Sequence, residues 1–208
     1  MRGARRIGPL VFRDRSGHSR RGRDVKLLSA VVHAIDWLNE RVGRAVSWLT
    51  VLMVINVFIV VVLRYTLSVG WIWMQELYVW SHATVFLLGA GYTLLHEGHV
   101  RIDLIYREAS LRYKAIINIL GSLILGGPLI YLIFDRSLPM ISRSWDSLEK
   151  SAEAGGMPGL FVFKSVVAVF AVLFGLQLLA LFLRSVETLL GADDDPEYLD
   201  TEDQEGGI

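Results

Sequence analysis

The sequence predicts an all-α integral membrane protein with four transmembrane helices, preceded by an amphipathic helix at the membrane surface. Apolar residues make up 53% of the 208 positions and gather in four long blocks, at residues 46–63, 77–95, 115–134 and 160–183. About 20 helical residues at a rise of 1.5 Å cross the hydrocarbon core of a bilayer. Because lipid offers no hydrogen-bond partner to an open strand, each block is expected to be a helix that satisfies its own backbone.

The distribution of Lys and Arg predicts how these helices are oriented. Formal charge is zero, yet eleven Lys and Arg precede the first block and nine Asp and Glu follow the last one. With the connections counted, sixteen Lys and Arg fall on one side of the predicted membrane and four on the other. Because the side richer in Lys and Arg faces the cytoplasm, we expect both termini to be cytoplasmic.

The two ends of the chain differ from its middle in composition. Residues 1–24 are rich in Arg, Gly and Ser, and residues 191–208 are acidic, so both are expected to be disordered. The basic arm lacks interleaved aromatic residues, which argues against a nucleic-acid site and favours attraction to anionic membrane lipids. The predicted membrane domain therefore covers residues 45–190.

Between the arm and the first span, residues 25–44 carry apolar side chains at helical spacing. These side chains share one face, and they are Leu28, Val31, Val32, Ile35, Leu38 and Val42. Such a helix is expected to lie in the cytoplasmic interface and then turn into the first span. It would serve either as an anchor on the lipid surface or as a brace against a partner subunit.

Polar side chains inside the spans are few, and they suit contacts between helices better than a substrate site. They are Asn56, His82, Thr84, Asn118, Ser122, Ser165 and Gln177. Lys164 is the one charged residue inside a span, and it either snorkels to the headgroups or forms a salt bridge to a neighbouring helix. Pro128 is expected to kink the third span, and residues 135–159 are expected to form a long loop.

Enzyme chemistry finds little support in the residues. The absence of cysteine excludes disulfides, thiolate nucleophiles and Cys-ligated metals. His96 and His99 with Asp103 could ligate a metal, but histidines at a helix end also bond terminal carbonyls. A bis-histidine haem needs paired histidines inside the spans, where only His82 lies. We expect no catalytic residue, no metal and no cofactor.

A set of short motifs surrounds the second span. Arg64-Tyr65 closes the first span, and the residues that follow it in order are Trp73, Glu76, Trp80, Gly89, His99-x-x-x-Asp103 and, near the last span, Gly155-Gly156-Met157-Pro158. In order and spacing, these motifs resemble the small membrane subunit of tripartite ATP-independent periplasmic (TRAP) transporters, the DctQ-like family. The resemblance covers about residues 25–190.

The resemblance implies a subunit of the bacterial inner membrane that acts as a scaffold in ion-gradient-driven symport of a small organic acid. Its partners would be a large membrane subunit and a periplasmic substrate-binding protein. Residues expected at subunit contacts or in assembly are Arg64, Trp73, Glu76, Trp80, His99, Arg101, Asp103 and Lys164. Glu76 is the first candidate for a salt bridge between helices or subunits. The alternatives are a haem- or quinone-binding anchor of a redox enzyme and a stand-alone small carrier.

Overall fold

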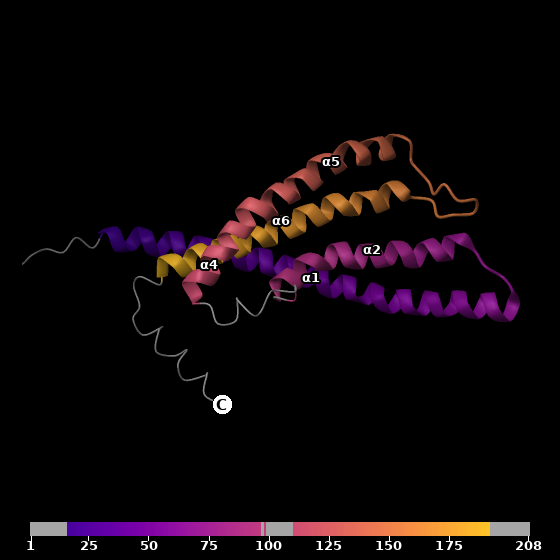
Figure 1. The fold of residues 1–208 in the computed structure, drawn as a ribbon, viewed down its shortest axis with the longest axis horizontal. Coiled ribbons are helices and arrows are strands. Elements are labelled where there is room, and N and C mark those ends of the chain that lie inside the picture. The colour runs from indigo at the N-terminus through magenta and orange to yellow at the C-terminus, as the bar shows by residue number, and fades with distance from the viewer. Residues whose placement is uncertain (1–15, 97, 99–109, 192–208) are drawn as a thin grey trace, which may run out of the picture.

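The computed structural model describes residues 16–96, 98 and 110–191, and every regular element in this part of the chain is helical (Figure 1). The elements are α1 (Ser16–Leu67), α2 (Ile72–Leu95), α4 (Leu111–Leu120), the π-helical segment η1 (Gly121–Gly126), α5 (Gly127–Asp146) and α6 (Leu160–Gly191).

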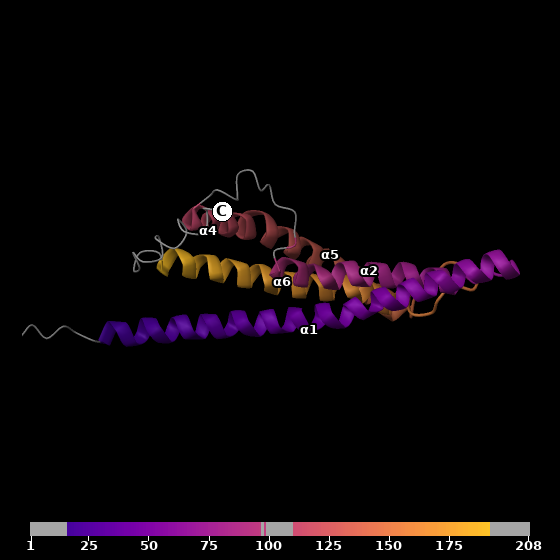
Figure 2. The ribbon, with the colours of Figure 1, turned by 90° about the horizontal axis from the view of Figure 1, so that it is seen from below.

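The helices form an elongated bundle with α6 at its centre. Helices α1 and α2 make an antiparallel hairpin, while α4, η1 and α5 follow one another as a continuous rod (Figures 1 and 2). Helix α6 contacts all of them and lies between the rod and the hairpin. The first residues of α1 and the last of α6 lie at one end of the bundle, and the connections 68–71 and 147–159 lie toward the other.

Three helical segments of the described part are long and apolar enough to cross a membrane. They are Leu28–Leu67, Leu111–Asp146 and Leu160–Leu190, and each contains one predicted block. The remaining predicted block, residues 77–95, forms most of α2. The mean hydropathy of α2 is too low for it to count among these three segments. Polar side chains such as Glu76 and His82 lower its hydropathy. A fourth crossing by α2 therefore stays a prediction.

Helix α1 replaces three segments that were expected to be separate, namely the disordered arm, the surface helix and the first span. It is one continuous helix of 52 residues that begins at Ser16, inside the predicted disordered arm, and passes position 44 without a turn. The predicted turn is wrong because residues 25–67 contain no proline and only one glycine, and a single glycine costs a helix about 1 kcal/mol relative to alanine. Residues 1–15 and 192–208, where disorder was also predicted, lie outside the described residues.

The third span also runs further than predicted. Helix α5 continues to Asp146, so the connection to α6 is residues 147–159 rather than 135–159. Pro128 is the second residue of α5, and the N–H of Gly127 before it bonds the Ser122 carbonyl of η1 in the wider π pattern. Prolines and π segments are both usual sites of a kink in a helix. The second proline, Pro139, lies inside α5 without ending it.

Candidate assembly site

The carboxylate of Glu76 links the first turns of α2 to the connection between α5 and α6. It accepts hydrogen bonds from the Ser151 hydroxyl and, at 2.5 Å, from the Met157 backbone N–H. Ser151 and Met157 are themselves joined, because the Ser151 N–H donates to the Met157 carbonyl over 3.1 Å. One side chain of α2 therefore holds a loop residue that lies 75 positions later in the sequence.

Glycines shape the loop around this carboxylate. A Cβ on Gly156 would lie 2.5 Å from the Ser151 Oγ and 2.8 Å from the Glu76 Oε2, so no larger residue fits without displacing the cluster. Gly155 has a φ of +80° and Gly159 a φ of +94°, in the left-handed region that favours glycine. The Gly155-Gly156-Met157-Pro158 motif is thus the backbone that lets Glu76 reach its two donors.

Lys164 forms an ion pair with this same loop. Its Nζ lies 2.5 Å from the Glu149 Oε2, which also accepts a hydrogen bond of 2.6 Å from the Ser144 hydroxyl. The ammonium of Lys164, and secondly the Ser144 hydroxyl, hold the pKa of the Glu149 carboxyl below its usual value. Lys164 therefore forms a salt bridge, as one of its two interpretations predicted, but the partner lies in the loop 147–159 and not on a neighbouring helix.

Aromatic side chains pack beside these polar contacts. Trp80 stacks on Phe163 with ring centroids 4.9 Å apart, which joins α2 to α6. The Trp145 indole N–H donates to the Ser165 hydroxyl over 2.9 Å, and its ring makes a T-shaped contact with the Phe161 ring, with centroids 4.6 Å apart. Trp80, which is one of the predicted assembly residues, therefore packs on the start of α6, and so does Trp145.

Of the remaining predicted residues, Arg64 and Trp73 are described and are not part of this cluster. Arg64 is exposed, and no ion pair to it occurs within the described residues, so Glu76 binds a hydroxyl and a backbone N–H rather than a cation. Trp73 is 43% exposed. His99, Arg101 and Asp103 lie outside the described residues.

A second polar cluster, which the sequence did not reveal, joins α1 to α6. Asn39 donates to the Gln177 side-chain oxygen over 2.8 Å, Gln177 donates to Asp36 over 3.0 Å, and Arg184 pairs with Asp36. Asn39 and Gln177 are each 1% exposed. A Cβ on Gly91 would lie 2.2 Å from the Asn39 Oδ1, so α2 also packs closely here.

This cluster changes the interpretation of residues 25–44. Val32 and Ile35 are buried against Ala180, so the apolar face of this part of α1 packs on α6 of the same chain. Val31 of the same face is 48% exposed, and a lipid anchor or a brace on another subunit stays a prediction for that part of it. The sequence carries one signal for this contact, because Asp36 and Asn39 stand beside that face.

Two further contacts join α1 to α2. The Asn56 side chain donates to the Met74 carbonyl over 2.9 Å, as expected of a polar group between helices. Glu40 contacts His96, the residue that ends α2, at 2.7 Å and Arg44 at 2.6 Å.

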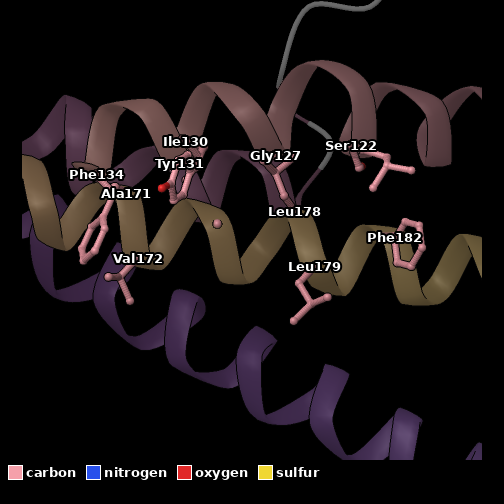
Figure 3. Close-up of a pocket in the computed structure, with 12 residues that line it drawn as sticks. Ser122, Gly127, Ile130, Tyr131, Phe134, Ala171, Val172, Leu178, Leu179 and Phe182 are labelled. Carbon is pink, nitrogen blue, oxygen red and sulfur yellow. The ribbon is translucent and has the colours of Figure 1, made fainter. Parts of the chain in front are cut away.

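An apolar groove of about 480 Å³ lies between η1–α5 and α6 (Figure 3). Leu178, Leu179 and Phe182 of α6 line it together with Ile130 and Phe134 of α5. The buried Ser122 Oγ at its edge has no hydrogen-bond partner within the described residues. Those residues also contain no cluster of three His, Asp or Glu that could hold a metal ion.

Comparison with known proteins decides what this bundle is. The family model described as the DctQ component of tripartite ATP-independent periplasmic transporters matches residues 52–188, well over half of the chain. The chain belongs to this DctQ family. It is a small permease subunit of a TRAP transporter, and its family is one of transporter components rather than enzymes. No curated protein and no solved structure matches the chain.

The matched residues include the whole Glu76 cluster. Helix α2, the loop 147–159 and most of α6 lie within residues 52–188. Asp36 and Asn39 lie before the match, so the α1 half of the second cluster falls outside the part of the DctQ chain that the family model covers.

Proposed function

We propose that this DctQ chain is a non-catalytic scaffold for the large membrane subunit of its TRAP transporter. The transporter takes up a small organic acid, driven by an ion gradient, after a periplasmic binding protein delivers it. The observation that carries this proposal is that polar side chains inside the spans form hydrogen bonds within the chain itself. Asn56 and Gln177 bond to neighbouring helices of the chain itself, which is the role of a structural polar group.

Polar contacts between the helices of the chain support the scaffold role. Asp36–Arg184 and Glu40–His96 tie the middle of α1 to α6 and to the end of α2. Glu76 and the Lys164–Glu149 pair tie the loop 147–159 to α2 and α6. A carrier that moves one part across the bilayer needs a part that stays fixed, and a cross-braced bundle suits that purpose.

The orientation proposed with this function has both termini in the cytoplasm and α2 as a fourth crossing. Four crossings return the chain to the side on which it began, and the first residues of α1 and the last of α6 do lie at one end of the bundle. The excess of Lys and Arg favours the cytoplasm for that end. Glu76 and the loop 147–159 then lie toward the periplasm, where the binding protein docks.

A surface for the large subunit is available on α1. Its outward side chains in the span are large and apolar, with Phe58 67%, Leu52 59% and Ile55 49% exposed. Van der Waals packing drives association between helices in lipid, so such a face suits either acyl chains or another subunit.

Co-purification tests this proposal. The full chain, tagged and co-expressed with the large subunit of its transporter, is expected to retain that subunit through detergent extraction and size exclusion. Phe58→Ala with Leu52→Ala should weaken the retention, while Tyr131→Ala, on an exposed face of α5, serves as the matched control. A chain that never retains the large subunit would refute the scaffold role, and a haem absorption band in the purified protein would point to a redox anchor instead.

A further inference from the structure

Helix α1 carries two tryptophans and two arginines in one line along its surface. Trp37, Arg41, Arg44 and Trp48 follow one another at spacings of four, three and four residues, which places them on one side of the helix. This side faces away from the bundle, because Trp37 is 60% exposed, Trp48 is 71% exposed and the Arg44 side chain is 71% exposed. We call these four residues the Arg–Trp stripe.

Both arginines of the stripe are held by neighbours. The Arg41 guanidinium lies over the Trp37 ring at 5.1 Å from its centroid, a cation–π contact. The Arg44 Nε donates to the Glu40 Oε1 over 2.6 Å, and the other Glu40 oxygen contacts His96. A guanidinium has five N–H donors, so the pair with Glu40 leaves donors for a second anion.

The stripe lies where the chain enters the membrane. Residues 45–63 contain no charged residue, and Arg44 and Arg64 bracket them. Nineteen helical residues at a rise of 1.5 Å span about 28 Å, close to the hydrocarbon thickness of about 30 Å. Arg44 therefore lies at one headgroup level, and Trp48 lies one turn deeper, at the depth where interfacial tryptophans concentrate.

We propose that the Arg–Trp stripe binds the phosphate headgroup of an anionic phospholipid in the cytoplasmic leaflet. Arg41 and Arg44 donate to the phosphate, and Trp48 packs against the glycerol and the upper acyl chain. The positive charge of the arginines and their position at the headgroup level both suit this ligand. The cytoplasmic leaflet carries the anionic lipids that attract basic residues near the membrane. The assignment of the leaflet rests on the orientation proposed above.

Lipid binding to the purified full chain tests the proposal. Native mass spectrometry in detergent would compare added phosphatidylglycerol with added phosphatidylcholine. The wild-type chain is expected to prefer phosphatidylglycerol, and Arg41→Gln with Arg44→Gln should weaken that binding about fivefold per substitution, about twenty-five-fold together. Arg41→Lys with Arg44→Lys keeps the charges and should keep the preference. Arg64→Gln, at the opposite headgroup level, is the matched control and should change nothing.

Other results would overturn the proposal. Equal affinity of the wild-type chain for the two lipids, or unchanged phosphatidylglycerol binding by the glutamine double variant, contradicts it. Arginine and tryptophan are also frequent at the centres of protein interfaces. If the double variant binds phosphatidylglycerol normally but loses the large subunit, the stripe is a protein interface. Because the lipid assay uses the isolated chain, failure of the scaffold role leaves its result unaffected.

Discussion

The Glu76 carboxylate and the Met157 backbone N–H, 81 positions apart, are joined by a hydrogen bond of 2.5 Å. This contact fixes the connection between α5 and α6 to the start of α2, and it depends on the glycines beside Met157. The loop thereby becomes part of the bundle instead of a free connection.

Replacing Glu76 by alanine is expected to destabilise the bundle by about 1–3 kcal/mol, because the Ser151 hydroxyl and the Met157 N–H lose their acceptor in a partly buried position. Thermal unfolding of the purified chain measures this loss. Glu153→Ala removes an exposed carboxylate from the same loop and should be nearly neutral. Equal effects of the two substitutions would show that the Glu76 contacts contribute nothing specific.

Gly156→Ala is expected to disturb the same cluster from the other side. The new Cβ would lie 2.5 Å from the Ser151 Oγ and 2.8 Å from the Glu76 Oε2, so one of these groups has to move. Since both substitutions break one set of contacts, Glu76→Ala with Gly156→Ala should cost less than the sum of the two single losses. Gly121→Ala, where a Cβ meets nothing within 4 Å, is the control that should not destabilise. Strict additivity of Glu76 and Gly156 would contradict a shared cluster.

The Lys164–Glu149 pair predicts a pH dependence of stability. Because the pKa of the Glu149 carboxyl is lower in the folded chain than in the unfolded one, its contribution is complete above the ordinary carboxyl pKa of 4.5. That contribution is lost as the pH falls through the lowered folded pKa. Glu149→Gln should therefore unfold at a lower temperature than the wild type at pH 7, with the difference shrinking in acid. Asp146→Asn, an exposed carboxylate at the end of α5, should not show this pattern. A difference that grows as the pH falls would contradict the assigned sign.

The Asp36–Arg184 ion pair is expected to stabilise the packing of α1 on α6 at a point that precedes the uncharged residues 45–63 of α1 in the sequence. Asp36→Asn and Arg184→Gln are each expected to cost about 1.5–3 kcal/mol, the range for hydrogen bonds to charged groups. The double variant should cost less than their sum, because the second change removes a group that the first left unpaired. Glu187→Gln, one turn further along α6, is the control. Single variants as stable as the wild type would mean that this pair does not hold the helices together.

Hydropathy predicted the helices of the membrane domain well, and for a physical reason. Long apolar runs have to be helical in lipid, and α6 begins at Leu160 as expected. The same reasoning ended the third span at position 134, where charges appear, although α5 continues to Asp146. Hydropathy reports where a chain meets water, and a helix does not have to end there.

Contacts between residues that are distant in the sequence could not be predicted from the sequence pattern. The Gly155–Pro158 motif and Glu76 were both recognised, but nothing in their spacing indicated that one binds the other. Lys164 had two open interpretations because its partner, Glu149, lies in a loop whose path depends on the whole bundle. The Asp36–Arg184 pair was missed because an acidic residue beside an apolar stripe is most often solvated.

Reconstituted transport tests the central claim, that this chain is a scaffold and carries no transport path of its own. Proteoliposomes would contain this chain, the large subunit, or both, with the binding protein, a radiolabelled organic acid and an imposed sodium or proton gradient. We predict uptake only when both membrane subunits are present. Uptake by this chain alone, or undiminished uptake by the large subunit without it, would contradict the account.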